Sequence, residues 1–125
     1  MSRLSFRAWR GKHYIGLTEL LSALGRRTAD MVWELRLDDV APGPEGERLR
    51  AAADGPRIST RDLMLTAFPD GQIIDGELHA FASPGDAEPL LVLYAVDSTE
   101  WDLETADPRV LAATREAFPG AADVG

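Results

Sequence analysis

The chain contains no cysteine, which excludes disulfides, thiolate metal sites and a cysteine nucleophile. Histidine is scarce as well: His13 and His79 are the only two, so one chain cannot form a histidine-rich metal site. The sequence also lacks a Gly-rich phosphate loop, a Walker A motif, a GxSxG elbow and an HExxH pattern. We therefore expect no metal and no cofactor, and no motif marks a catalytic residue.

Long apolar runs are missing too. None approaches the roughly 20 residues needed to span a bilayer, and the longest, Pro89 to Val96, has the length of a strand. The first residues lack the continuous apolar stretch of a signal peptide. We therefore expect a cytoplasmic protein with no membrane partner. Twelve arginines against a single lysine, Lys12, together with abundant alanine and glycine, predict a bacterial source with a GC-rich genome.

The size of the chain predicts a single domain over residues 1–125. At 13.6 kDa, area scaling gives roughly 6,600 Å² of folded surface against roughly 19,700 Å² for the unfolded chain. Folding would then bury about two-thirds of the surface. Apolar residues make up 45% of the sequence, which is close to the globular norm. These values predict one substantial hydrophobic core.

The N-terminal half alternates between strand and helix patterns. Residues 4–8 and 31–38 alternate apolar and polar side chains, as expected for strands with one wet face. Four leucines between residues 17 and 24 are spaced to form one apolar face, which predicts a helix over about 18–25. Short helices are predicted over 47–53 and from a Ser59 or Thr60 cap to Ala67.

The C-terminal half predicts two strands and a helix. Residues 72–81 and 89–98 read as strands, and the second is the most apolar segment of the chain. Residues 99–106 are expected to form a loop, followed by a helix over about 108–118 with Asp107 as its cap. The fold class is therefore α+β: an antiparallel or mixed sheet of about four to five strands, with two main helices and one or two short helices packed on one face.

The net charge of −8 is unevenly distributed. Residues 1–62 carry eleven basic and nine acidic side chains, whereas residues 63–125 carry two basic and twelve acidic ones. Such asymmetry is typical of a partner surface. The alternative is that the two halves face each other and neutralise part of their charge.

The acidic stretch YAVDSTEWDLETADP, residues 94–108, contains one tryptophan, Trp101, within a run of carboxylates. One interpretation is that the indole folds back to cover the core while its neighbours stay in water. The other is a docking patch for a basic partner, with Trp101 as anchor. The candidate contact residues are Asp97, Glu100, Trp101, Asp102 and Glu104, with Asp75 and Glu77 adjacent if a hairpin forms.

A second candidate site lies in IIDGELHAF, where Asp75, Glu77 and His79 alternate and so share one face of a strand. These are ligand types of a non-thiolate metal site, and Asp97 could add a fourth group. Successive positions on one strand lie about 6.6 Å apart, however, which is too far for a compact site. The simpler interpretation is a solvated polar face.

Two further alternatives involve the N-terminal segment. Arg7 and Trp9 share a strand face near Tyr14, and basic residues with aromatics can bind nucleic acid. The acidic net charge opposes this. The same aromatic residues could instead be buried between copies of the chain in an oligomer or a larger complex, and the oligomeric state is left open.

The preferred hypothesis is a small acidic protein-binding module, not an enzyme, that masks a basic protein partner. Immunity proteins, antitoxins and inhibitors of nucleic-acid-directed enzymes fit this description, because their targets are cationic. The alternatives are a small enzyme or ligand-binding domain that uses Asp75, Glu77 and His79, and a structural subunit.

Overall fold

The computed structural model describes residues 1–124 and is built around a seven-stranded antiparallel sheet with the order β5-β4-β6-β7-β8-β1-β9. The five long strands are β1 (Ser2–Arg7), β4 (Val32–Val40), β6 (Ile73–Phe81), β7 (Leu91–Val96) and β8 (Glu100–Thr105). The two-residue strands β5 (Ile58–Ser59) and β9 (Ala122–Asp123) form the edges. A small separate hairpin consists of β2 (Trp9–Arg10) and β3 (His13–Tyr14).

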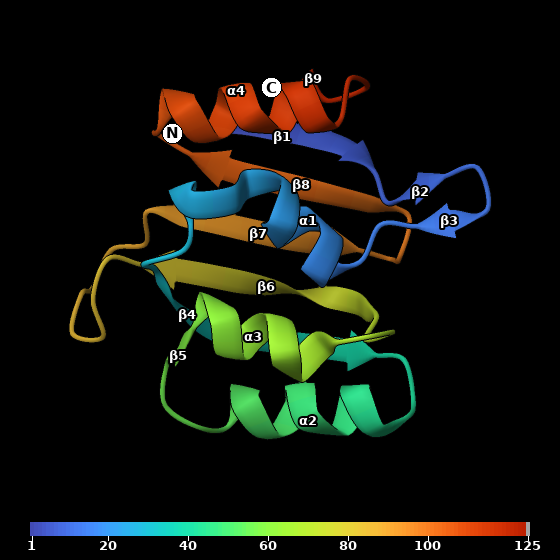
Figure 1. The fold of residues 1–125 in the computed structure, drawn as a ribbon, viewed down its shortest axis with the longest axis vertical. Coiled ribbons are helices and arrows are strands. Elements are labelled where there is room, and N and C mark those ends of the chain that lie inside the picture. Colours follow the sequence, from blue (N-terminus) through green and yellow to red (C-terminus); the bar gives the residue numbers. More distant parts are fainter. Residues whose placement is uncertain (125) are drawn as a thin grey trace.

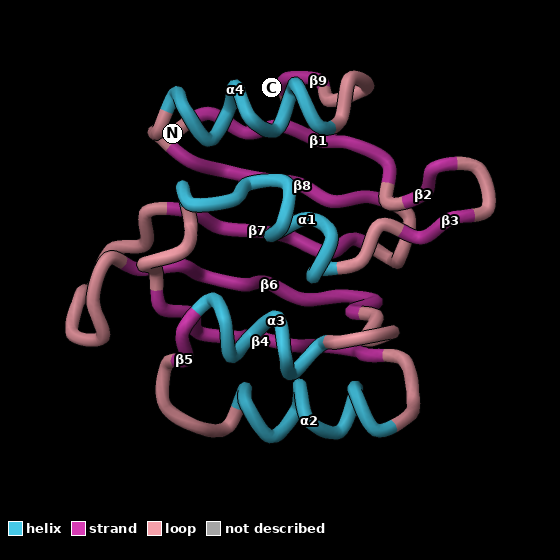
Figure 2. The backbone as a smooth tube through the Cα atoms, in the orientation of Figure 1, coloured by secondary structure: helices cyan, strands magenta, loops and turns pink. Residues whose placement is uncertain are grey.

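Four α-helices pack on one side of this sheet (Figures 1 and 2). They are α1 (Leu17–Leu24), α2 (Pro44–Ala53), α3 (Thr60–Ala67) and α4 (Pro108–Ala117), and a short 3₁₀ turn, η1 (Gly25–Arg27), follows α1. Helix α1 lies over the middle of the sheet and α3 over β4, near the β5 edge, whereas α4 lies beside β1 and α2 beside β4. No helix among residues 1–124 is long and apolar enough to cross a membrane.

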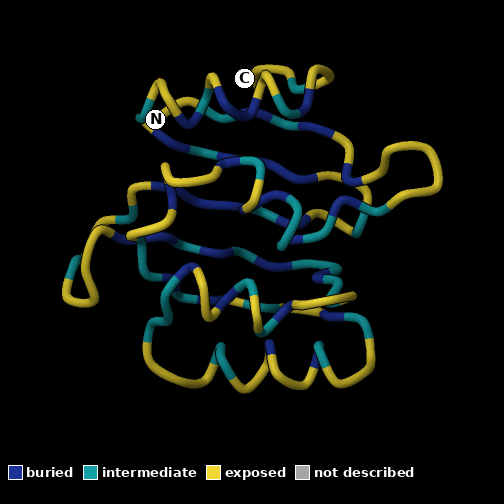
Figure 3. The backbone as a smooth tube through the Cα atoms, viewed as in Figure 1, coloured by how far each residue is buried: buried dark blue, intermediate teal, exposed yellow. Residues whose placement is uncertain are grey.

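The core lies between the sheet and the helices, where the tube of Figure 3 is dark blue. Alternate residues of the long strands point into it, including Phe6, Leu35, Leu78, Leu93 and Leu103. The four leucines of α1 are all buried, as their spacing predicted. The core is therefore assembled from period-two patterns on the strands and a helical pattern on α1.

One buried hydrogen-bond network joins β4 to α3. The indole of Trp33 is fully buried, and its Nε1–H donates to Thr60 Oγ1 at 2.8 Å. The Thr60 hydroxyl in turn donates to the backbone oxygen of Thr28. Because a buried donor without a partner costs about 1–3 kcal/mol, this network fixes where α3 begins on the sheet.

The structure confirms the α+β class and corrects the number of strands. The sheet has seven strands instead of four to five, and there are four α-helices. The main correction concerns residues 99–106, which were expected to form a loop: Glu100–Thr105 is the long strand β8, hydrogen-bonded to β7 on one side and β1 on the other. Its carboxylates suggested a loop because acidic residues are depleted in strands.

The turn from β7 to β8 explains why this strand was missed. Its two central residues, Asp97 and Ser98, both have positive φ, 50° and 55°, and Thr99 N donates to Val96 O at 2.9 Å. This is the backbone of a type I′ hairpin turn, which asparagine and glycine usually occupy. The turn is instead held by its neighbours: Trp9 Nε1–H donates to Ser98 O, and Gln72 Nε2–H donates to Ser98 Oγ.

Gly46 gives a first testable prediction, because it lies inside α2 against the preceding loop. A Cβ atom at this position would collide with the backbone oxygen of Ala41. Alanine normally stabilises a helix interior relative to glycine by about 0.5–1 kcal/mol. We expect the opposite sign here: Gly46→Ala should lower the free energy of unfolding by about 1–2 kcal/mol, measured by urea denaturation.

Gly55→Ala is the matched control, since a Cβ at Gly55 would meet nothing closer than 3.7 Å. This variant should change stability by less than about 0.5 kcal/mol. If both variants have wild-type stability, α2 does not approach Ala41 as closely as described.

Candidate functional site

One face of the sheet carries no helix among the described residues, and its side chains form the candidate site. We call this surface the open face. It consists of the strand residues that alternate with the core positions: Arg3, Ser5, Arg7, Val32, Glu34, Arg36, Asp75, Glu77, His79, Phe81, Val92, Tyr94, Val96, Glu100, Asp102 and Glu104.

Strand pairing arranges these side chains in rows across the sheet. One row runs through Arg36, Glu77, Tyr94, Asp102 and Ser5. The next runs through Glu34, His79, Val92, Glu104 and Arg3. Directly opposite residues of an antiparallel pair have Cβ atoms about 4.5–5.5 Å apart. Carboxylates far apart in the sequence are therefore brought onto one surface, where Tyr94, His79 and Val92 separate them within the rows.

Six of the seven predicted contact residues lie on this face or at its end. Glu77 is on β6, and Glu100, Asp102 and Glu104 are on β8. Asp75 and Asp97 meet where the face ends, because Asp75 Oδ1 accepts a hydrogen bond from the backbone N–H of Asp97 at 2.8 Å. The structure thus gathers these acids from two strands and one turn.

Trp101 points the opposite way and belongs to the core. Its side chain alternates with Glu100 and Asp102, and the residue is 1% exposed. The indole Nε1–H donates to the backbone oxygen of Ile15 at 2.8 Å. The hypothesis that Trp101 anchors a partner is therefore wrong, since the indole already fills a buried position beneath α1.

Ion pairs neutralise part of the open face. It holds six carboxylates and three arginines. Arg36 pairs with Glu34 at 2.7 Å, and Arg57 reaches the same carboxylate from beyond the face at 3.5 Å. Hydrogen bonding from Arg36, reinforced by both positive charges, lowers the pKa of Glu34. Among the residues that the structure describes, Glu77 pairs only with His79, at 2.9 Å.

Tyr94 occupies the middle of the open face and is surrounded by charged groups. The Arg3 guanidinium lies over its ring, 4.0 Å from the centroid, and the Tyr94 hydroxyl donates to Glu104 Oε1 at 3.2 Å. Burial and the nearby Glu104 charge raise the pKa of Tyr94. Arg3 also donates to Asp102 Oδ2 from Nε (3.0 Å) and Nη2 (2.7 Å).

Asp102 is the most deeply buried charged residue of the open face, at 8% exposure. Burial lowers the pKa of Arg3, but the hydrogen bond and charge of Asp102 outweigh this effect and raise it. The second carboxylate oxygen, Asp102 Oδ1, is buried and has no hydrogen-bond partner among the described residues. Buried polar atoms normally have partners, so this oxygen marks an incompletely satisfied site.

Sequence reasoning missed Arg3 and Tyr94 as members of the site. The signal for Tyr94 is present in LLVLYAV, where Leu91, Leu93 and Ala95 face the core and the intervening residues face the other way. The apolar character of the whole segment concealed this alternation. Arg3 lies 99 residues from Asp102, and no local pattern reports such a pairing.

The basic N-terminal segment does not neutralise the acidic half as a whole. Arg3 alone in this segment pairs with the acidic half, through Asp102, among the described ion pairs. Arg10 and His13 instead both pair with Glu19, an acid of the same segment, at 3.3 and 2.7 Å. Most of the acidic excess beyond residue 62 is therefore left without an arginine partner.

Asp75, Glu77 and His79 share one face of β6, as their alternation predicted. They do not converge: Asp75 is engaged with the Asp97 backbone, and Glu77 bonds to His79. Among residues 1–124, no group of three or more His, Asp or Glu side chains is placed to hold a metal ion. Their arrangement is a row along a half-buried face of β6.

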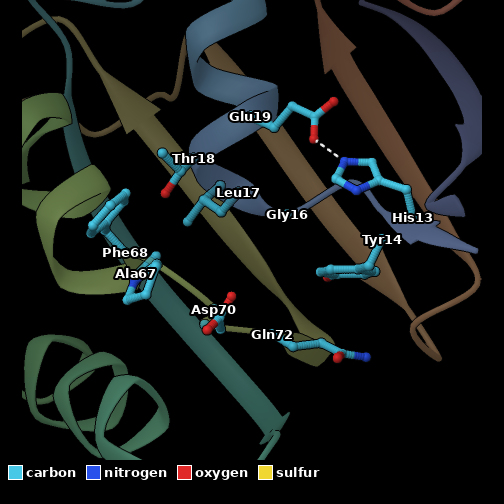
Figure 4. A pocket seen from close by; sticks show the side chains of 12 residues that line it. His13, Tyr14, Gly16, Leu17, Thr18, Glu19, Ala67, Phe68, Asp70 and Gln72 are labelled. Atoms are coloured by element: carbon cyan, nitrogen blue, oxygen red, sulfur yellow. Dashed lines mark hydrogen bonds and ion pairs between the residues drawn. The ribbon is translucent and has the colours of Figure 1, made fainter. Parts of the chain in front are cut away.

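A cleft of about 490 Å³ lies on the helix side, between the start of α1 and the turn at residues 68–72 (Figure 4). Several of its polar groups are already engaged: Glu19 pairs with His13 and Arg10, and Gln72 donates to Ser98. Burial raises the pKa of Tyr14, which also lines the cleft, to about 12. This phenol therefore stays protonated at neutral pH.

Comparison with protein-family models, with curated proteins and with solved structures gives no match to this chain.

Proposed function

We propose that this protein is a binding module that masks a basic protein partner with the open face of its sheet. The observation that carries the proposal is that Glu77 on β6 and Glu100 and Glu104 on β8 lie on one surface without a covering helix, with strand β7 between the two groups. None of these three carboxylates forms an ion pair with an arginine among the described residues. A cationic surface that docked here would gain partners for all three.

Charge supports the same proposal at longer range. A net charge of −8, with most of the excess acid beyond residue 62, gives a field that attracts cationic proteins. Complementary charge raises association rates by about 10–10³-fold and makes them sensitive to salt. Small basic nucleases and other enzymes that act on nucleic acids carry the complementary surface, because their own ligand is anionic.

The test is a charge-reversal experiment against a panel of small basic nucleases. The variant Glu77→Lys/Glu100→Lys/Glu104→Lys should associate at least about tenfold more slowly than the wild type at low salt. The wild-type rate should also fall steeply between about 50 and 300 mM salt, because added salt shortens the Debye length and screens the attraction between the two surfaces. Stopped-flow fluorescence measures both rates, and residual nuclease activity reports masking.

The matched control reverses three exposed acids outside the open face: Asp30, Asp54 and Glu116. It changes the net charge equally, so it should slow association much less. Equal slowing in the two triple variants would mean that net charge, and not this face, controls the encounter. Wild-type inhibition by the open-face variant would overturn the proposed function.

A further inference from the structure

The open face already holds one guanidinium group, that of Arg3, in a site built from three side chains. We call Tyr94, Asp102 and Glu104 the guanidinium seat. Tyr94 supplies the ring beneath the cation, Asp102 accepts two N–H donors, and Glu104 holds the Tyr94 hydroxyl. We propose that an arginine of the basic partner displaces Arg3 from this seat and becomes the main anchor of the complex. This inference rests on the proposed function and specifies its partner chemistry.

The seat is not saturated by Arg3. Both hydrogen bonds from Arg3 go to the same oxygen, Asp102 Oδ2. The other oxygen, Oδ1, is buried without a donor among the described residues, in a residue that is 8% exposed. A guanidinium can engage both carboxylate oxygens with two parallel N–H groups. Once displacement of Arg3 uncovers this oxygen, an incoming arginine would make a bond that Arg3 does not make.

Arg3 is also placed so that it can leave. It is the second residue of β1, and its side chain is 34% exposed. Among the described residues, the Arg3 side chain hydrogen-bonds only to Asp102. Moving the side chain into water therefore breaks one ion pair and one ring contact, and leaves the backbone of β1 in place.

Arg57, in contrast to Arg3, is a guanidinium group that several contacts hold in place. It lies over the ring of Phe81 at 3.5 Å, with a side chain only 18% exposed. It donates to the backbone oxygens of Pro84 and Asp86 as well as approaching Glu34. Arg57 is thus bound to the 83–86 loop as a structural cation, whereas Arg3 has no such backbone ties.

The chemistry of the seat selects arginine over lysine. A planar guanidinium stacks on an aromatic ring and matches a carboxylate with its fork of donors, whereas an ammonium is a compact, strongly hydrated charge. Glu77 lies directly across from Tyr94, on the opposite side from Asp102. A second arginine of the partner can pair with Glu77, whose present partner is His79.

The experiment compares Arg3→Ala with Arg7→Ala, using hexa-arginine and hexa-lysine peptides as probes. Both variants remove one positive charge from the same face of β1, and Arg7 has no ion pair among the described residues. Calorimetry should show that Arg3→Ala binds hexa-arginine about tenfold more tightly than Arg7→Ala does. Hexa-lysine should bind the two variants equally. Adding Tyr94→Leu to Arg3→Ala should abolish the arginine preference.

A small-molecule titration tests the seat by itself. Ethylguanidinium at millimolar concentration should stabilise Arg3→Ala against urea and perturb the Tyr94 amide resonance, whereas ethylammonium at equal ionic strength should do neither. If Arg3→Ala does not fold, the Arg3 Nε–H resonance of the wild type is followed instead. Hexa-arginine should shift it toward its solvent-exposed position, and hexa-lysine should leave it unchanged.

The possible failures are distinguishable. If both peptides bind to the open face but Arg3→Ala and Arg7→Ala behave alike, the exchange of Arg3 is overturned and the proposed function survives. If the wild type and both variants bind neither peptide, and the basic nucleases are not masked either, the proposed function fails and the inference fails with it.

Discussion

Replacing Trp101 by alanine is expected to lower the free energy of unfolding by about 3–5 kcal/mol, the range found for large aromatic residues removed from cores. The indole is 1% exposed and lies opposite Phe6 on β1 and Ala95 on β7. Its loss creates a cavity next to the Phe6–Phe118 stack, whose centroids are 4.3 Å apart. It also leaves the buried oxygen of Ile15 without its donor.

Two further variants separate the contributions at this position. Trp101→Phe keeps most of the side-chain volume, so it should cost less than Trp101→Ala. The remaining loss, about 1–3 kcal/mol, comes from the missing hydrogen bond to Ile15. Glu100→Ala, on the preceding residue and the opposite face, should cost less than about 0.5 kcal/mol. Urea denaturation followed by circular dichroism gives all three values. A loss below 1 kcal/mol for Trp101→Ala would contradict the placement of this indole in the core.

Replacing Arg3 by alanine is expected to lower the free energy of unfolding by about 2 kcal/mol. Removing one partner of a fully buried ion pair costs about 3–5 kcal/mol, because a buried charge loses its counter-ion. The pair here is only partly buried: the Arg3 side chain is 34% exposed and that of Asp102 11%. Solvent screening reduces the cost accordingly.

Replacing the other partner of the ion pair, Asp102, should lower the free energy of unfolding by less. Asp102→Leu removes the buried charge and leaves a cation that can reach water, so its cost should stay below about 1 kcal/mol. The double variant Arg3→Met/Asp102→Leu replaces the pair by apolar side chains and should recover most of the stability lost in Arg3→Ala. Equal losses in the two single variants would show that Asp102 is not the less solvated partner. The measurement is again urea denaturation at neutral pH.

These stability effects bear directly on the proposed function. If the guanidinium seat evolved only to hold Arg3, the Arg3→Ala variant should be destabilised and have no new affinity for guanidinium. If the seat binds a partner's arginine, the same variant should be less stable and yet bind arginine more tightly. Measuring stability and binding on the same variants distinguishes the two cases.

The helices could be predicted largely from the sequence because their signals are local. The leucine spacing of residues 17–24 gives α1 its buried face. Ser59 Oγ accepts from Asp62 N at the start of α3, and Asp107 Oδ1 accepts from Arg109 N at the start of α4. A helix cap and a helical spacing of apolar residues both act within a few residues, so they can be recognised in the sequence without knowing the fold.

Strand β8 could not be predicted because its stability is not local. Glu100, Asp102 and Glu104 disfavour a strand in isolation, and the turn before it lacks glycine and asparagine. Hydrogen bonds to β7 and β1, with Trp101 and Leu103 in the core, overcome that preference. Tertiary contacts of this kind routinely override the intrinsic propensity of a segment.

The sequence by itself determined the helices, the alternating strands and the excess of acid beyond residue 62, because each depends on composition or short-range spacing. Only the tertiary structure decided which acids face outward together, that Trp101 lies inside, and that Arg3 sits on Tyr94 beside Asp102. The physical reason is strand register. Pairing of β1, β8, β7 and β6 sets which side chains become neighbours, and a shift of one residue would send every one of them to the opposite face.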